Sequence, residues 1–402
     1  MATTRAFCGA SDRAIPEPVR GGSPDPPRHR REHGARVPGP CAADREPRRA
    51  PAERATPTRV AGALAGALLG VLAISGCTQV ATEPKAGRAW PPPPQPARIV
   101  LQQVVLGAKD FEKPDFFSAL GRLIVGDQRQ TFLRPQAVAL DGDRRLYIAD
   151  QEHQAIHVFD LKEGKARFWD RVERTLFVSP AGVAVLDGGN VAVSDSMLNR
   201  VFVLTPDGKL VRQIDRPGGF RRPTGMAYDA GRRLFYVVDT LAHDVCVFRL
   251  TGEYLRCFGA PGTGDGLLNF PTYIAVDGQG LIYVTDSLNF RVQIFNAEEK
   301  YVRQIGKLGD ATGFMAVPKG VAVDSHGHLY VADSALSTVQ VFDRDGTLLL
   351  AFGERGDGPG SFQIPTGLAI GPGDRIYVCD AFARRLQVFQ YVEPNDETTK
   401  NP

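Results

Sequence analysis

PKGVAVDSHGHLYVADS, residues 318–334, contains two short apolar runs separated by a polar turn rich in Gly, Asp and His. Pro318 opens the first run and Asp333 ends the second. Apolar runs of this length, bounded by turn residues, are typical of β-strands. The stretch therefore predicts a pair of strands joined by a tight turn, with a proline and an aspartate marking its two ends.

The same pattern occurs six times, and successive aspartates lie 45, 44, 47, 47 and 47 residues apart. The prolines are Pro135, Pro180, Pro223, Pro271, Pro318 and Pro365. The aspartates are Asp150, Asp195, Asp239, Asp286, Asp333 and Asp380. A period of this length is typical of the blades of a β-propeller, and because one blade cannot bury both of its faces, six copies predict a closed ring of six blades.

The fourth copy shows the composition of a whole blade. Its predicted strands are TYIAV (272–276), LIYVT (281–285), RVQIF (291–295) and KYVRQIG (300–306). In other copies the third and fourth strands are joined by Asp-Gly pairs at 207–208 and 345–346. Such pairs between strands indicate β-hairpins, so each blade is predicted to be a four-stranded antiparallel sheet.

Three of these segments resemble NHL repeats: residues 318–334, PTYIAVDGQGLIYVTDSLNFRVQIF (271–295) and PTGLAIGPGDRIYVCD (365–380). The resemblance extends over about residues 135 to 391 and recurs six times in register. It implies an all-β fold, a six-bladed NHL β-propeller.

The two ends of the repeat region predict how the ring closes. The last copy ends after its third strand, at LQVFQYVE (386–393), whereas an unassigned run, RIVLQQVVLG (98–107), precedes the first copy. This run resembles the fourth-strand segments YVRQIG and LLLAFG. We therefore expect the N-terminal strand to complete the sixth blade, which would cover an open sheet edge, and we assign the propeller to residues 98–393.

Residues 60–76 read as a signal peptide, because a stretch of small and apolar residues follows a positive flank. The sequence ISGC (74–77) resembles the lipobox of bacterial lipoproteins, which implies lipid attachment at Cys77 and a bacterial envelope location. An ordinary secretory signal with an incidental cysteine is the alternative. No aspartate follows Cys77, which favours the outer membrane over the inner in a cell that has both.

The remaining segments are not expected to build a core. Residues 1–59 are a disordered leader or the product of a start site assigned too early, residues 77–97 are a proline-rich membrane spacer, and residues 394–402 are a polar tail. Residues 1–59 carry 12 arginines and 7 acidic residues, a charge of +5. Since the whole chain is +3, the rest is −2, which argues against nucleic acid as a partner.

Two cysteines flank the Thr251-Gly252 turn. With a two-residue loop, Cys246 and Cys257 face each other across the hairpin, and in an oxidising compartment they are a disulfide candidate. Two reduced thiols are the alternative. Cys379 occupies a position where other copies have Ala, Ser or Thr, so it is predicted to be a buried free thiol.

The search for catalytic groups gives little support for an enzyme. The six repeat aspartates are predicted to hold loops through backbone amides, since a role repeated in every blade is structural. The histidines His153, His157, His243, His326 and His328 are not expected to converge, and no nucleophile motif is visible. We therefore assign no catalytic residue, metal or cofactor, and leave enzymatic activity uncertain.

Departures from the repeat suggest a binding region near the central channel. Tyr273 stands where four other copies have glycine, and Arg134, Arg221, Arg222 and Lys319 lie close to the same loops. Such a set can bind a small anionic ligand or an acidic envelope protein, with scattered solvated charge as the alternative. The predicted function is a membrane-anchored, non-catalytic binding scaffold. The alternative is a channel-site lyase or lactonase of the propeller type, dependent on a metal.

Overall fold

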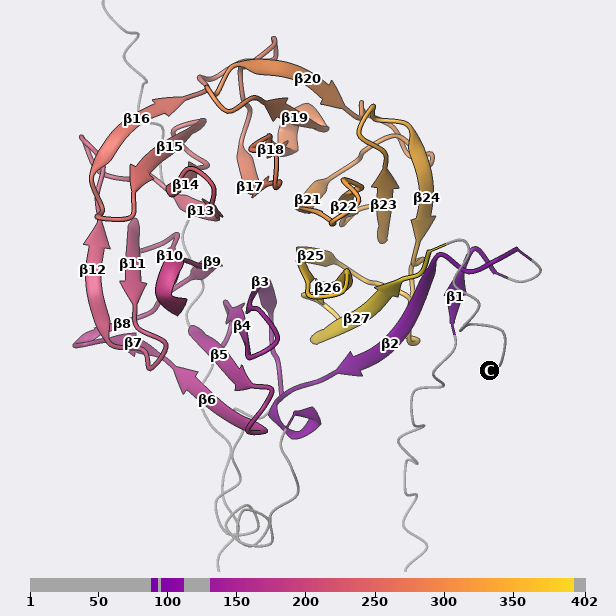
Figure 1. Cartoon of the computed structure of the whole chain (residues 1–402), viewed down its shortest axis with the longest axis horizontal. Helices are drawn as coiled ribbons and strands as arrows, with labels where there is room; N and C mark the ends of the chain where they lie inside the picture. The colour runs from indigo at the N-terminus through magenta and orange to yellow at the C-terminus, as the bar shows by residue number, and fades with distance from the viewer. Residues whose placement is uncertain (1–87, 93–94, 112–130, 394–402) are drawn as a thin grey trace, which may run out of the picture. The chain divides into compact units, whose positions relative to one another are not determined.

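The computed structural model describes residues 88–92, 95–111 and 131–393, and it arranges six antiparallel sheets in a ring (Figure 1). Each sheet is one blade, and its innermost strand begins at one of the six repeat prolines. The second strand of each blade ends at the repeat aspartate. The predicted six-bladed, all-β architecture is confirmed.

The first five blades follow the chain in order, from the innermost strand to the outermost. Blade 1 contains β3 (Pro135–Asp141), β4 (Arg145–Asp150), β5 (Ala155–Asp160) and β6 (Lys165–Trp169). Blade 2 contains β9 (Pro180–Val185), β10 (Val191–Asp195), β11 (Arg200–Leu204) and β12 (Leu210–Ile214). Blade 3 contains β13 (Pro223–Asp229), β14 (Leu234–Asp239), β15 (Asp244–Arg249) and β16 (Tyr254–Phe258). Blade 4 contains β17 (Pro271–Val276), β18 (Ile282–Asp286), β19 (Arg291–Phe295) and β20 (Tyr301–Ile305). Blade 5 contains β21 (Pro318–Val323), β22 (Leu329–Asp333), β23 (Thr338–Phe342) and β24 (Leu348–Phe352).

The sixth blade joins the two ends of the ring. Its strands β25 (Pro365–Gly371), β26 (Arg375–Asp380) and β27 (Arg385–Tyr391) come from the end of the repeats, and β2 (Ile99–Val105) comes from before the first repeat. Strand β2 pairs antiparallel with β27, with Leu101 opposite Phe389 (Figure 1). The predicted closure of the ring by an N-terminal strand is confirmed.

A fifth strand lengthens this sheet. Strand β1 (Ala89–Trp90) pairs with the outer edge of β2. The Trp90 ring lies 5.9 Å from Phe352 and 5.8 Å from Phe389, and Arg88 pairs with Glu354. Residues 88–90 fall in the segment predicted as a spacer, but in the structure they pack against the propeller and cover part of its last sheet edge.

Short elements complete the described chain. They are the hairpin β7 (Arg171–Val172) and β8 (Thr175–Leu176) and the 3-10 helices η1 (Ala108–Asp110), η3 (Asp187–Gly189) and η4 (Ser287–Asn289). The described residues contain no helix long and apolar enough to cross a membrane.

The hydrophobic core consists of six clusters, and each is shared by two neighbouring blades. The cluster between the sixth and first blades joins Val105 and Leu386 to Leu146 and Phe159, all fully buried. Each blade therefore buries both of its faces, which it can do only inside a closed ring.

Glycines of the Pro-x-Gly motif allow the innermost strands to approach one another. A Cβ atom added at Gly182 would lie 2.1 Å from the backbone oxygen of Thr224 in the next blade, and one at Gly367 would lie 2.4 Å from the oxygen of Gln136. Since no side chain fits at these positions, glycine is required by close packing around the channel.

Candidate functional site

The six repeat aspartates hold the loops on one face of the ring. All six are fully buried. Asp333 accepts hydrogen bonds from the amides of Ala316 and Val317 before its blade, and from those of Ala335 and Leu336 after the second strand, at 2.7–3.2 Å. The predicted structural role of these aspartates is confirmed.

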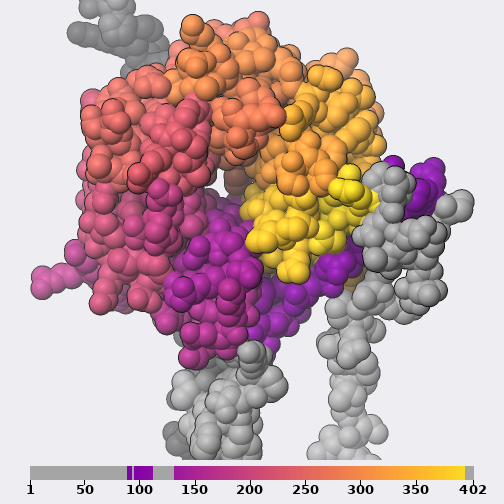
Figure 2. Space-filling model, in the orientation of Figure 1, coloured from indigo at the N-terminus to yellow at the C-terminus, as the bar shows by residue number. Residues whose placement is uncertain are grey.

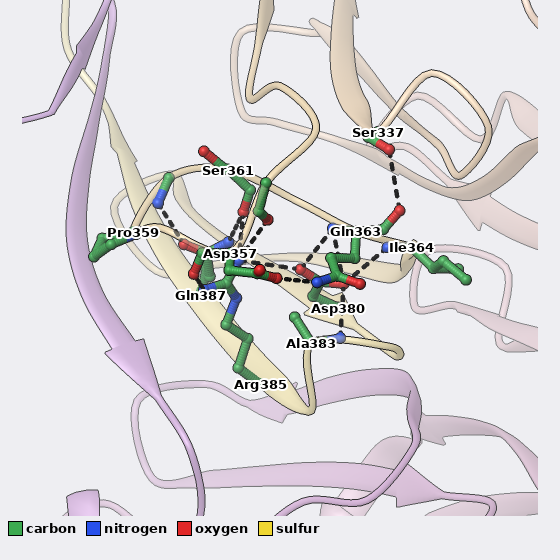
Figure 3. A network of polar contacts seen from close by, with 12 residues as sticks. Ser337, Asp357, Pro359, Ser361, Gln363, Ile364, Asp380, Ala383, Arg385 and Gln387 are labelled. Atoms are coloured by element: carbon green, nitrogen blue, oxygen red, sulfur yellow. Dashed lines mark hydrogen bonds and ion pairs between the residues drawn. The ribbon is translucent and has the colours of Figure 1, made fainter.

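In the sixth blade, further side chains extend this network (Figure 3). Asp380 accepts from the amide of Ile364 at 2.9 Å. Arg385 and Gln387 both donate to the carbonyl oxygen of Ser361, at 2.8 and 2.7 Å. These hydrogen bonds thus hold the loops on the strands beneath them.

We call this surface the loop face. It consists of the loops after the second strands and the residues just before the innermost strands. The two kinds of loop are bonded to each other in successive blades; for example, the amide of Ser196 donates to Ser179 at 2.9 Å, and that of Ala381 to Ile364 at 3.0 Å.

Exposed apolar side chains recur at one repeat position on the loop face, two residues after the repeat aspartate. These residues, here called the apolar ring, are Met197, Leu241, Leu288 and Phe382. Met197 and Phe382 are 69% and 66% exposed. The sequence prediction missed this feature, although aligning the six repeats by their aspartates would have revealed it.

The predicted basic residues also lie on the loop face, around the opening of the channel. Arg134, Arg221 and Arg222 have exposed side chains, while their backbone amides donate to Asp150 or Asp239. Lys319 is half-buried. Burial, and then the positive charge of Arg222, lower the pKa of Lys319.

The sequence led us to expect Tyr273 to stand free at the channel mouth, but the structure shows a different arrangement. Its side chain crosses the channel, and its hydroxyl donates to the backbone oxygen of Gln136, on the opposite side of the ring, at 2.8 Å. Burial raises the pKa of the Tyr273 hydroxyl. The expectation is therefore corrected: the hydroxyl of Tyr273 is engaged by a backbone carbonyl across the channel and does not stand free for a ligand.

The central channel leaves little space. The opening at the centre of the ring is narrow (Figure 2), and the cavity within it has a volume of about 50 Å³. Tyr273 is the one residue with an ionisable side chain among the described residues that line it; the others are glycine or apolar. Small-molecule sites usually occupy about 300–1,000 Å³.

Larger cavities lie outside the channel. One of about 390 Å³ is on the loop face, lined by Arg355, Asp357, Gln363, Ile364 and Phe382, the last of which belongs to the apolar ring. Another, of about 440 Å³, lies between the segment around β1 and blades 5 and 6; its lining includes Arg98, His328 and Tyr391.

The prediction that the histidines do not converge is wrong for two pairs. The rings of His326 and His328 stack with their centroids 5.7 Å apart, close to Asp324. In the other pair, His153 meets His157. His153 Nδ1 lies 3.1 Å from His157 Nε2, and both lie near the Asp150 carboxylate. His153 is in the loop after β4 and His157 is in β5, and the loop turns back over the strand. Spacing alone did not reveal this contact because the residues were assigned to different elements.

The predicted cysteine register is present in the structure. Cys246 pairs with Cys257 across β15 and β16, and their Sγ atoms form a disulfide. Cys379 is a free, buried thiol, and burial raises its pKa well above the usual value. Cys77 and the predicted signal peptide lie outside the described residues.

A model of the NHL repeat matches residues 268–295 and 315–342. No curated protein matches this sequence. Three solved structures illustrate the fold similarity. A gluconolactonase from Xanthomonas campestris is 17% identical, with a TM-score of 0.51 over 73% of this chain and 98% of its own. A Bacteroides thetaiotaomicron protein of unknown function is also 17% identical, with a TM-score of 0.51 over 65% and 70%. Virginiamycin B lyase from Staphylococcus aureus is 13% identical, with a TM-score of 0.50 over 65% and 96%. These likenesses concern the fold alone. The chain contains NHL repeats and folds as a six-bladed β-propeller.

Proposed function

We propose that this chain is a non-catalytic binding protein of the bacterial envelope, anchored by lipid at Cys77, whose loop face holds a protein partner. The observation that carries the proposal is the apolar ring. Exposed apolar side chains gathered on one face of a domain are typical of interaction surfaces, whereas single scattered ones are common on any protein.

The composition of the loop face fits a protein partner with acidic groups. Protein interfaces combine apolar anchors with arginine, and residues such as Phe382 and Met197 supply anchors that stay exposed in the isolated ring. Arg134, Arg221 and Arg222 surround the channel opening within this area, and Lys319 adds a partly desolvated cation. Carboxylates on the partner would pair with these groups.

The groove beside Phe382 offers a place for one side chain or short segment of the partner. Its lining combines the apolar Ile364 and Phe382 with the charged Arg355 and Asp357. Because Asp380 holds the backbone amide of Ile364, this part of the groove loses little backbone entropy when it is filled.

The tether limits how far the binding face stands from the membrane. The described part of the propeller begins at residue 88, so ten residues separate it from Cys77. Fully extended, ten residues span about 35 Å. A lipid at Cys77 would therefore keep the ring close to the bilayer, where envelope proteins are its expected partners; the outer membrane is the proposed location in a cell that has two membranes.

The alternative, a metal-dependent lyase or lactonase with its site in the channel, is not supported by the residues that line the channel. The described lining of the channel offers no imidazole or carboxylate, and its cavity of about 50 Å³ is small for a substrate. The likeness to a lyase and a lactonase supports the fold and not the activity.

The test is affinity capture of the full lipoprotein from mildly crosslinked envelopes. A variant carrying Met197→Ser and Phe382→Ser is compared with a control carrying Val302→Ser and Leu349→Ser, which alters apolar residues of the outer strands that are 46% and 48% exposed. We expect one stoichiometric protein partner that is lost with the first variant and kept with the control. Equal capture by both variants would overturn the proposal, and capture of an anionic metabolite alone would replace the protein partner with a ligand.

A further inference from the structure

Three metal-ligating atoms converge in the first blade, under the loop face. His153 Nδ1 lies 3.1 Å from His157 Nε2, and Asp150 Oδ2 lies 3.3 Å from the former and 3.5 Å from the latter. The three side chains are 9%, 3% and 0% exposed. Two imidazoles and a carboxylate thus point at one nearly closed volume.

We propose that Asp150, His153 and His157 bind a zinc ion. Zinc lies about 2.0–2.2 Å from nitrogen and oxygen ligands and prefers tetrahedral geometry. In a tetrahedron of this size the ligand atoms stand roughly 3.3–3.4 Å apart. The three observed separations bracket this value.

Comparison with the fourth blade shows that the two imidazoles stand further from their carboxylate than hydrogen-bonded amides do at the same repeat positions. Asn289 and Gln293 occupy the positions of His153 and His157 there, and their amide nitrogens donate to Asp286 Oδ2 at 2.8 and 3.0 Å. The imidazole nitrogens of the first blade stand about half an ångström further from their carboxylate. Charge-assisted hydrogen bonds are usually about 2.7–2.9 Å long.

The first blade also differs from two others in the positive charge next to its repeat aspartate. In blades 4 and 6 an arginine five residues after the repeat aspartate pairs with its carboxylate: Arg291 with Asp286 at 2.9 Å, and Arg385 with Asp380 at 3.4 Å. The first blade has Ala155 at this position. In the first blade a divalent cation would supply the positive charge that arginine supplies in blades 4 and 6; blade 5, with Thr338 at this position, also lacks such an arginine.

The surroundings favour metal binding over solvation. Phe132 and Phe168 lie edge to face against the His157 ring, at 5.1 and 5.0 Å between ring centroids. An apolar shell limits the access of solvent to a metal site. A bound ion would tie the loop after β4 to strand β5, close to the point where the chain enters the first blade.

The repeat itself supplies the test variant. His153→Asn with His157→Gln converts the site to the amide pair that the fourth blade already accommodates. Zinc affinity of the full-length protein, without a histidine tag, is measured by competition with a chromophoric chelator. We expect one zinc per chain in the parent protein, an affinity lower by about 100-fold or more in the variant, and a zinc-dependent rise in Tm of roughly 2–4 °C only in the parent.

A matched control variant and cobalt spectroscopy identify which side chains bind the metal. His326→Gln with His328→Gln alters the other described His-Asp group, which includes Asp324, and should leave zinc affinity unchanged. Cobalt should give visible d–d bands without thiolate charge-transfer absorption, because no cysteine takes part. Zinc affinity unchanged in the first variant, lowered by the control, or accompanied by thiolate bands would overturn the proposal.

Discussion

Asp333→Asn is expected to destabilise the propeller strongly, although it preserves the shape of the side chain. Asp333 Oδ1 accepts from the amides of Val317, Ala335 and Leu336, while Oδ2 accepts from the amide of Ala316 at 2.7 Å. An asparagine that keeps Oδ1 turns an NH₂ group toward the amide of Ala316. That buried donor then lacks an acceptor, at a cost of about 1–3 kcal/mol.

The loss of charge adds to this cost. Hydrogen bonds to a charged acceptor contribute about 1.5–3 kcal/mol each, against about 1 kcal/mol for neutral ones, so the remaining bonds weaken as well. Together the two effects lower the free energy of unfolding by about 3–5 kcal/mol, a large share of the roughly 5–15 kcal/mol that keeps a typical domain folded. At roughly 2 °C per kcal/mol, Tm falls by about 6–10 °C.

Thermal and urea unfolding followed by circular dichroism would measure the effect, with Asp345→Asn as the control. Asp345 is exposed in the hairpin turn of the same blade, and Asn-Gly suits this turn as well as Asp-Gly does. If Asp333→Asn changed the free energy of unfolding no more than the control does, the argument that the repeat aspartates hold the loops would be wrong.

Three further perturbations test other parts of the structure. Tyr273→Phe leaves a carbonyl across the channel without its donor and should cost about 1–2 kcal/mol in urea unfolding; no change would mean that the hydroxyl bond is unimportant. Replacing Cys246 and Cys257 by serine should lower the free energy of unfolding by roughly 3 kcal/mol, and reductant should lower that of the parent protein to the same level. If reductant left the stability of the parent unchanged, the two cysteines would not be crosslinked. Lys319→Met should stabilise the ring near neutral pH but weaken partner binding. Burial and the charge of Arg222 lower the folded-state pKa of Lys319, so the parent protein should gain stability as pH rises through that pKa toward 10.5, whereas the variant should not. Equal pH profiles of Tm for the two proteins would contradict this.

The features that repeat were predictable from the sequence. Six prolines and six aspartates at an almost constant spacing defined the blades, and the fourth-strand character of residues 98–107 defined the closure. The pairing of Cys246 with Cys257 followed from turn geometry. In each case a local rule, repeated many times or fixed by hydrogen-bond register, left few alternatives.

The features that depend on distant contacts were not predictable. Tyr273 was expected at the channel mouth, but its bond to Gln136 joins opposite sides of the ring and appears only when the ring is closed. Trp90 was assigned to a spacer, although it packs on Phe352 and Phe389. A proline-rich composition indicates an extended chain and does not say which surface that chain follows.

The proposed binding role is tested most directly by site-specific photocrosslinking in the native envelope. A photoreactive amino acid is placed at Met197, Leu288 or Phe382 in the apolar ring, and at Val302 or Leu349 on the outer strands, one position per experiment. We expect the same protein adduct from each position in the apolar ring and none from the outer strands. Adducts of equal yield from both sets, or from the outer strands alone, would contradict the assignment of the loop face as the binding surface.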